Sequence, residues 1–216
     1  MNVIDIRSMF RAALVNQEFT IDKTGAKTIE ILGASFLADQ NTIFGTVNNV
    51  YVQEELEWYD SMSTNINDIR DGEPPAAWQY SANKHGEINS NYGLLINSRQ
   101  YHNQYSNALQ ELKRNPDTRR ASMVYQRPSI WVDYNANGKN DFICTNAVTY
   151  YKRDGKLNAV VQMRSNDAVF GYKNDYAWQC DVLHSLVQDL DDGTEFGDIY
   201  WQVQNMHVYE RHFHLI

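Results

Sequence analysis

Cysteine is scarce in this sequence, and its scarcity excludes disulfide scaffolds and zinc fingers. The chain has 216 residues and 2 cysteines, Cys144 and Cys180, which do not form a Cys-x-x-Cys motif. Proline is also rare, with 4 residues, and no repeat or low-complexity linker divides the chain. We therefore expect a single domain over residues 1–216, in a reducing compartment where a functional cysteine would stand out.

Long apolar runs and an excess of positive charge are missing as well. No stretch reaches 18 apolar residues, and the N-terminus is charged where a signal peptide needs an apolar core. The sequence therefore predicts a soluble, cytoplasmic protein without a membrane span. Lysine and arginine number 19 against 27 aspartates and glutamates, and the net charge of −8 disfavours binding to nucleic acid or to an anionic membrane. One small anionic substrate, bound by a few local cations, is compatible with this charge.

The residues that are present favour a globular α+β fold. Hydrophobic residues make up 43% of the chain, with 14 Tyr, 8 Phe and 5 Trp, which is enough for a sizeable core. Hydrophobic periodicity predicts helices at residues 4–17, 50–63, 104–114 and 175–190. Strands are predicted within residues 19–38, 119–163 and 196–209. Because helices and strands are mixed without a β-α-β rhythm, we expect a mixed or antiparallel sheet flanked by helices.

The best-defined local structure is a β-hairpin around Asp154-Gly155. This dipeptide separates two runs of alternating residues, 144–151 and 157–164, and is a strong signal for a two-residue turn. With these two residues as the loop, Arg153 pairs with Lys156. The same register places Cys144 across from Ser165.

Arg164 then lies one position from the residue opposite Cys144, so a thiol is predicted close to a guanidinium. A neighbouring cation lowers the pKa of a thiol and raises the thiolate fraction that a cysteine nucleophile requires. A buried structural cysteine would explain Cys144 equally simply. Cys180 lies on the apolar stripe of the predicted helix 175–190, so we expect it to be structural.

Other patterns carry weaker signals. Residues 133–138 match the first half of a calcium loop, but the twelfth position holds Cys144 instead of a bidentate Glu, and an Asn-Gly hairpin turn explains them more simply. His207, His212 and His214 have no carboxylate or cysteine at a ligand spacing, so no metal site is predicted. Glu55 lies on the apolar side of its predicted helix, either as a rim residue or as an acid–base group.

Several motifs together resemble the thymidylate synthase family, in that family's order and spacing, over almost the whole chain. They are Glu55-Leu56-Glu57-Trp58-Tyr59, Asn115-Pro116-Asp117-Thr118-Arg119-Arg120, Cys144, Arg164-Ser165-Asn166-Asp167 and His207-Val208-Tyr209. Within the family the resemblance is strongest to the phage deoxycytidylate hydroxymethylases. That similarity rests on Asp22-Lys23-Thr24-Gly25 and on the stretches 86–93 and 170–179. The resemblance implies the thymidylate synthase fold and a homodimer formed through the face of the sheet.

The resemblance also implies a role for each candidate residue. Cys144 would be the nucleophile that adds to C6 of a pyrimidine, and Glu55 the acid that orders water and shuttles protons. The phosphate would be bound by Lys23, Arg164 and Ser165, with Arg119 and Arg120 supplied by the second subunit. Further implied contacts are Asn166 and Tyr92 with the nucleotide, His207 and Tyr209 with the sugar hydroxyl, and Asp167 and Trp78 with folate.

One departure from the synthases concerns the base. Synthases read uracil with an Asn eight residues after the Asp of Arg-Ser-x-Asp, and this chain has Asp175 there. An ionised carboxylate only accepts hydrogen bonds, which fits the N4 amino group of cytosine and favours a proton on N3. A helix N-cap would be a second reason for an Asp at this position. The resemblance with this departure implies that the substrate is dCMP.

A second departure concerns the outcome of the reaction. The nucleophile stands in Ile143-Cys144-Thr145-Asn146, as in the hydroxymethylases, and not in the Pro-Cys-His of synthases. The implied activity is that of a deoxycytidylate 5-hydroxymethyltransferase with 5,10-methylenetetrahydrofolate as co-substrate. In this reaction water adds to the methylene group that the folate leaves on C5 of the base. The alternatives are an enzyme acting on dUMP, either a thymidylate synthase or a uracil hydroxymethylase, and a non-catalytic nucleotide-binding relative.

The resemblance raises two further expectations. Family members continue past the strand with His207 and Tyr209 into a C-terminal tail that closes over folate, whereas this chain ends at Ile216, so we expect that tail to be missing. A phage origin would place the protein in the cytoplasm of the infected host and suggests a larger nucleotide-synthesis complex.

Overall fold

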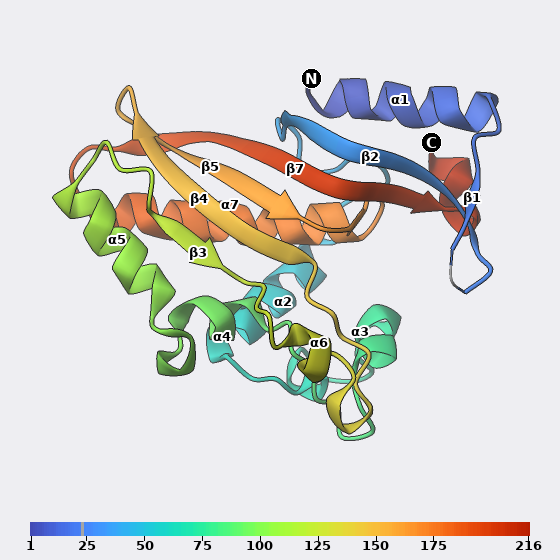
Figure 1. Cartoon of the computed structure of the whole chain (residues 1–216), viewed down its shortest axis with the longest axis horizontal. Helices are drawn as coiled ribbons and strands as arrows, with labels where there is room; N and C mark the ends of the chain where they lie inside the picture. The colour runs from blue at the N-terminus through green and yellow to red at the C-terminus, as the bar shows by residue number, and fades with distance from the viewer. Residues whose placement is uncertain (23) are drawn as a thin grey trace.

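The chain folds around one mixed β-sheet, seen in a computed structural model that describes residues 1–22 and 24–216 (Figure 1). The strand order is β1-β2-β7-β5-β4-β3, with β6 beside β7. Two pairs, β5 with β7 and β6 with β7, are parallel, and the others are antiparallel. The strands are β1 (Thr20–Ile21), β2 (Lys27–Leu37), β3 (Ser122–Val124), β4 (Thr145–Arg153), β5 (Lys156–Met163), β6 (Asn166–Asp167) and β7 (Glu195–Tyr209). The predicted mixed sheet is confirmed.

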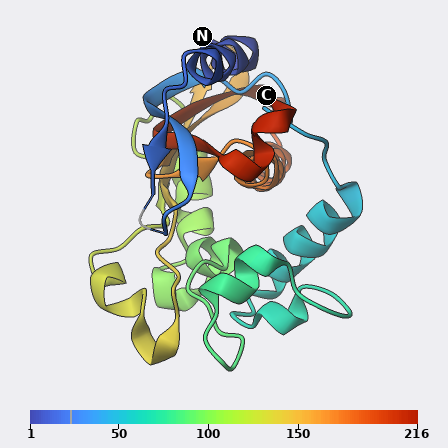
Figure 2. The ribbon, with the colours of Figure 1, turned by 90° about the vertical axis from the view of Figure 1, so that its right-hand side faces the viewer.

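Helices cover one side of this sheet in two layers (Figures 1 and 2). Helix α7 runs beneath the strands and makes the crossover between the parallel strands β5 and β7, a β-α-β connection that the sequence did not predict. Helix α5 packs against α7 and the edge strand β3, α2 and α4 pack against each other farther from the sheet, and α1 lies along β2. The bounds are α1 (Val3–Val15), α2 (Asn49–Ser61), α3 (Ala76–Ser81), α4 (Tyr92–Asn97), α5 (Gln104–Arg114), α6 (Ile130–Asp133) and α7 (Gly171–Leu190).

A close approach between α2 and α4 requires glycine. A Cβ atom on Gly93 would lie 1.9 Å from the carbonyl oxygen of Tyr59, so no larger residue fits between the two helices. This contact stacks the ring of Tyr59 on that of Tyr92 at 5.3 Å. Both rings also contact the buried Trp178 of α7. The aromatic cluster therefore fixes the helices that carry the candidate site residues.

Two predictions of secondary structure were wrong. Helix α7 begins at Gly171, four residues before the predicted start, so Asp175 lies inside the helix and is not its N-cap. The predicted strands do not extend through residues 125–144, where α6 and a 3₁₀ turn at Ala136–Gly138 are found instead. Asn137 and Gly138 both have positive φ, of 57° and 83°, and so form a turn, but α6 and irregular residues adjoin it instead of strands.

The predicted hairpin is present, with one change of register. Asp154 and Gly155 have φ of 52° and 75°, as a two-residue turn of this kind requires, and Arg153 pairs with Lys156. A β-bulge between Thr145 and Ala147 then shifts the pairing by one residue.

Candidate active site

The β-bulge at the start of β4 determines what faces Cys144. Arg164, and not the predicted Ser165, lies opposite Cys144, and the Arg164 backbone N–H donates to the Cys144 carbonyl at 2.9 Å. The prediction was wrong by one residue because a sequence pattern does not reveal a bulge. The predicted neighbourhood of thiol and guanidinium is present, since Nη2 of Arg164 lies 3.5 Å from Sγ of Cys144.

Arg164 is held rigidly beside the thiol. Its Nε donates to the carbonyl of Ile143 at 2.9 Å, its Nη2 donates to the carbonyl of Phe142, and its guanidinium lies 4.9 Å from the centre of the Phe142 ring. Burial raises the pKa of the Cys144 thiol to about 11, while the charge of Arg164 lowers it. Arg164 thus acts in the predicted direction, but burial outweighs it. The thiol keeps its proton at neutral pH, so forming the thiolate requires a proton acceptor.

Glu55 on α2 is a buried carboxyl with two defined donors. Its Oε1 accepts from the hydroxyl of Tyr51 at 2.6 Å and from the indole Nε1 of Trp78 at 3.0 Å. Tyr51 lies four residues earlier on the same helix face, and Trp78 comes from α3. Burial raises the pKa of Glu55, and both hydrogen bonds lower it. This arrangement suits a group that takes up and releases a proton, and the i,i+4 spacing could have revealed Tyr51 in the sequence.

Asp175 is the third ionisable group of the site. Burial and the charge of Glu55 raise its pKa to about 8, while hydrogen bonds from Asn166 and Tyr92 lower it. Asp175 therefore carries its proton for much of the time at neutral pH, in place of the permanently ionised form expected from the sequence. Its charge also acts on the Cys144 thiol and on Tyr92, so these groups form one electrostatic unit.

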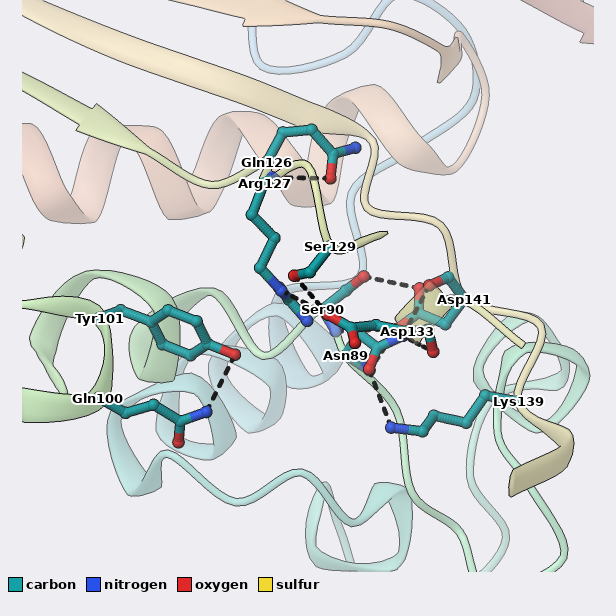
Figure 3. Close-up of polar contacts among 10 residues, drawn as sticks. All are labelled: Asn89, Ser90, Gln100, Tyr101, Gln126, Arg127, Ser129, Asp133, Lys139 and Asp141. Atoms are coloured by element: carbon teal, nitrogen blue, oxygen red, sulfur yellow. Dashed lines mark hydrogen bonds and ion pairs between the residues drawn. The ribbon is translucent and has the colours of Figure 1, made fainter. Parts of the chain in front are cut away.

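A fixed network of polar groups supports the loop that precedes Cys144 (Figure 3). The buried carboxylate of Asp141 accepts from the backbone N–H groups of Asn89 and Ser90, at 2.6 and 2.8 Å, and from the Ser90 hydroxyl at 2.6 Å. The amide of Asn89 donates to the Asp141 carbonyl at 2.9 Å and accepts from Nζ of Lys139 at 2.9 Å. The segment before α4 is thereby attached to the nucleophile loop. No sequence pattern pointed to Asp141.

Tyr92 joins the site from the N-terminus of α4. Its hydroxyl accepts from Oγ1 of Thr145, next to the nucleophile, at 2.9 Å. The side chain is buried, and burial raises its pKa well above the ordinary value for tyrosine. The predicted site residue Tyr92 therefore lies between the nucleophile loop and Asp175.

The two predicted sugar residues and Asp167, one of the two predicted folate residues, are adjacent on β6 and β7. Strand β6 pairs with β7 so that Asp167 lies opposite His207. The rings of His207 and Tyr209 are 5.1 Å apart. Burial lowers the pKa of His207, and the charge of Asp167 raises it. The structure thus brings these three residues together.

Arg119 and Arg120 are far from Cys144 in the same chain. They precede β3, in which Ser122 pairs with Thr149 of β4. Cys144 lies five residues before Thr149, on the side away from the two arginines, so about 20 Å of extended chain separates them from the thiol. Arg120 is 78% exposed and forms an ion pair with Glu111 at 3.3 Å. Lys23 lies outside the described residues.

Comparison with known proteins identifies the family. The thymidylate synthase family model matches residues 7–216. The chain belongs to the thymidylate synthase family. It is 53% identical over its whole length to the deoxycytidylate 5-hydroxymethyltransferases of Enterobacteria phages T4 and T2, and covers 89% of each of those proteins. It is 29% identical to the thymidylate synthase of Corynebacterium aurimucosum, over 88% of this chain and 72% of that protein.

Membership of the thymidylate synthase family confirms the resemblance that the motifs predicted. The phage hydroxymethylase relatives are also more similar to the chain than the bacterial synthase is, as the motifs at residues 86–93 and 170–179 indicated. Within the described part of the chain, no helix combines the length and apolar character of a membrane span. The same residues contain no group of three or more His, Cys, Asp and Glu side chains able to hold a metal ion.

Proposed function

We propose that this member of the thymidylate synthase family is a deoxycytidylate 5-hydroxymethyltransferase. It would transfer a one-carbon unit to C5 of dCMP and add water to that carbon, which gives 5-hydroxymethyl-dCMP. The observation that carries the substrate choice is Asp175, which is half-buried, has a pKa of about 8 and takes part in the charge network of Cys144 and Glu55. A carboxyl that holds a proton at neutral pH offers a donor and an acceptor side by side. Cytosine offers the matching pair, an acceptor at N3 and a donor at N4.

The proposed chemistry begins at Cys144. Its thiolate adds to C6 of the base while Asp175 supplies a proton to N3, so the ring accepts the electron pair without building up negative charge. C5 then becomes nucleophilic, and 5,10-methylenetetrahydrofolate would supply the one-carbon unit. Loss of the C5 proton then expels tetrahydrofolate and leaves an exocyclic methylene on C5. Water adds to this methylene carbon, and the Cys144–C6 bond breaks as the N3 proton is returned, which releases 5-hydroxymethyl-dCMP.

Glu55 is the group we assign to the water step. Burial raises its pKa and so makes it a better proton acceptor than an exposed glutamate, and Tyr51 and Trp78 occupy one carboxylate oxygen, which leaves the other for an ordered water. A general base at this place would activate the water that adds to the C5-methylene. Trp78 also presents a partly exposed indole beside Glu55, which suits a flat pteridine ring, and Asp167 would accept hydrogen bonds from the co-substrate.

We assign the nucleotide phosphate to Arg164 and Ser165, with Lys23 predicted from the sequence alone. His207 and Tyr209 would bind the sugar hydroxyl, since a histidine and a phenol offer both donors and acceptors to it. Arg119 and Arg120 are too distant to share the phosphate in the same chain. We therefore propose that they enter the site of a second subunit.

The dimer we propose forms through the outer face of the sheet. Tyr200, Gln202 and Gln204 of β7 alternate with buried residues and are exposed on this face, together with Leu32 of β2, which is 73% exposed. A hollow of about 360 Å³ lies between these strands. A twisted sheet with small polar and apolar side chains can bury such a face against its own copy.

The cytoplasm of an infected host is the expected location, because the most similar relatives reported above are phage enzymes.

Product analysis tests this function. Purified protein is incubated with 5,10-methylenetetrahydrofolate and either dCMP or dUMP, and the nucleotide product is identified by mass. We expect 5-hydroxymethyl-dCMP. Thymidylate or 5-hydroxymethyl-dUMP as the main product would replace the proposal with an activity on dUMP. No product from either nucleotide would favour a non-catalytic role.

A further inference from the structure

Three side chains form a chain of hydrogen bonds that ends on Asp175. The indole Nε1 of Trp201, on β7, donates to Oδ1 of Asn166 at 3.2 Å. Nδ2 of Asn166, on β6, donates to Oδ2 of Asp175 at 2.8 Å. Trp201 and Asn166 are 0% and 3% exposed, so the bond between them is shielded from water, while the bond to Asp175 is part-buried.

The chemistry of Trp201 fixes the direction of every bond in this chain. An indole N–H can only donate, so the Asn166 amide must turn its oxygen toward Trp201. Its NH₂ group must then face Asp175, and Oδ2 of Asp175 must accept. If the Asn166 amide were reversed, two donors would meet at Trp201, and Oδ2 of Asp175 would have to carry the carboxyl proton to pair with the amide oxygen. A buried clash of this kind leaves polar groups unpaired and is strongly disfavoured.

We propose that Trp201 and Asn166 are positioning residues that set base selectivity by keeping Oδ2 of Asp175 an acceptor and directing the carboxyl proton to Oδ1. The inference rests on the proposed function, because it concerns how the base is read. With the proton on Oδ1, the carboxyl offers one donor and one acceptor in a fixed order. Cytosine, with an acceptor at N3 and a donor at N4, matches one order. Uracil, with a donor at N3 and an acceptor at O4, requires the reverse.

This assignment changes the role predicted for Asn166. The sequence resemblance placed it among the residues that contact the nucleotide. Its amide is instead occupied by Trp201 on one side and Asp175 on the other, and its side chain is buried. Asn166 thus acts on the base through Asp175. The titratable groups linked to Asp175 by charge or hydrogen bonding are Glu55 and Tyr59 of α2, Tyr92 of α4, Tyr125, Cys144 and Asp167 of β6.

The test removes the fixed donor and leaves the ring in place. Trp201→Phe frees the Asn166 amide to rotate, so Asp175 can offer either order of donor and acceptor. We expect the dCMP-to-dUMP ratio of dissociation constants, measured by calorimetry, to move toward dUMP by about tenfold or more, since one buried hydrogen bond is at stake. The ratio of kcat/KM for dCMP to kcat/KM for dUMP should shift by a similar factor. The pH dependence of the dissociation constant for dCMP should change as well. Asn166→Leu, which removes both bonds, should shift selectivity in the same direction, and the two effects should not be additive.

Trp58→Phe is the matched control. Trp58 is 1% exposed, and its indole N–H donates to the carbonyl of Asn65 at 3.0 Å, so the variant loses an indole hydrogen bond from a similarly buried ring without touching Asn166. Its selectivity should equal that of the wild type. Unchanged selectivity in a folded Trp201→Phe or Asn166→Leu protein would overturn the inference. A wild-type protein that prefers dUMP, or binds neither nucleotide, would instead contradict the proposed function, so the two failures are distinguishable.

Discussion

Arg164 lies directly opposite Cys144 across a β-bulge, with its Nη2 3.5 Å from the thiol sulfur. The bulge matters because a regular hairpin would place Ser165 there and turn the guanidinium to the other face of the sheet. The backbone carbonyls of Phe142 and Ile143 hold the guanidinium in place. The positive charge therefore partly offsets the effect of burial on the thiol.

Removing this charge should make Cys144 less reactive. In Arg164→Gln the pKa of the thiol should rise further, because a cation within a few ångströms lowers a thiol pKa by one unit or more. Alkylation by iodoacetamide at fixed pH should slow by about tenfold. The rate is measured in a Cys180→Ser background, so that only Cys144 reports. An unchanged rate would show that the guanidinium does not influence the thiol.

Replacing Asp175 should change the base that the enzyme prefers. Asp175→Asn offers an amide, which donates to O4 and accepts from N3–H of uracil, so kcat/KM should fall by about 100-fold or more for dCMP and increase for dUMP. Steady-state kinetics with both nucleotides measure the change. Retained preference for dCMP would contradict the role of Asp175 as the base reader.

The same substitution predicts a pH-dependent change in stability. Burial raises the pKa of Asp175 from its ordinary 3.8 to about 8, so the folded protein holds this proton more tightly than the unfolded chain. The wild type therefore loses stability from this group as the pH rises from about 4 to about 8. Asp175→Asn has no such proton, and its thermal midpoint relative to the wild type should increase over this range. A constant difference between the two midpoints would show that the pKa is not raised.

Glu55→Gln should block the water step. The amide cannot take a proton from water, so formation of the hydroxymethyl product should fall by about 100-fold or more. Tyr51→Phe removes only one of the two donors to Glu55, and its effect should be smaller. Product formation is followed by mass. Equal losses in the two variants would indicate that positioning of Glu55, and not its proton transfer, limits the reaction.

Mixing two inactive variants tests the proposed second subunit. Arg119→Ala/Arg120→Ala and Cys144→Ser should each be nearly inactive. After subunit exchange, half of the dimers are mixed and each contains one intact site, so about a quarter of the wild-type activity should return. Recovery is measured after refolding an equimolar mixture. No recovery, with dimers present by light scattering, would place both arginines outside the partner's site.

Much of the fold could be predicted because its signals are local. The bounds of α5 and the Asp154-Gly155 turn depend on neighbouring residues and were found at the expected positions. The errors arose where tertiary contacts decide. The bulge after Cys144 and the early start of α7 leave no local signal in the sequence, and the segment between residues 125 and 144 is held by distant contacts such as that of Asp141 with Ser90.

The candidate site shows the same division. Cys144, Glu55 and Asp175 were recognisable because their motifs resemble a family. Trp201 and Asp141 were missed, since each acts through a contact with a residue far along the chain, 35 residues for Trp201 with Asn166 and 51 for Asp141 with Ser90. The direction of the net pKa shift at Cys144 also depends on burial, which a motif does not convey.

The central claim is that Asp175 and Cys144 together select and activate cytosine. The most direct measurement is a competition in which equimolar dCMP and dUMP, both tritiated at C5, react in one vessel with limiting enzyme and 5,10-methylenetetrahydrofolate. The account predicts that 5-hydroxymethyl-dCMP is almost the only product, and that Cys144→Ser abolishes tritium release. Predominant conversion of dUMP, or tritium release that survives Cys144→Ser, would contradict it.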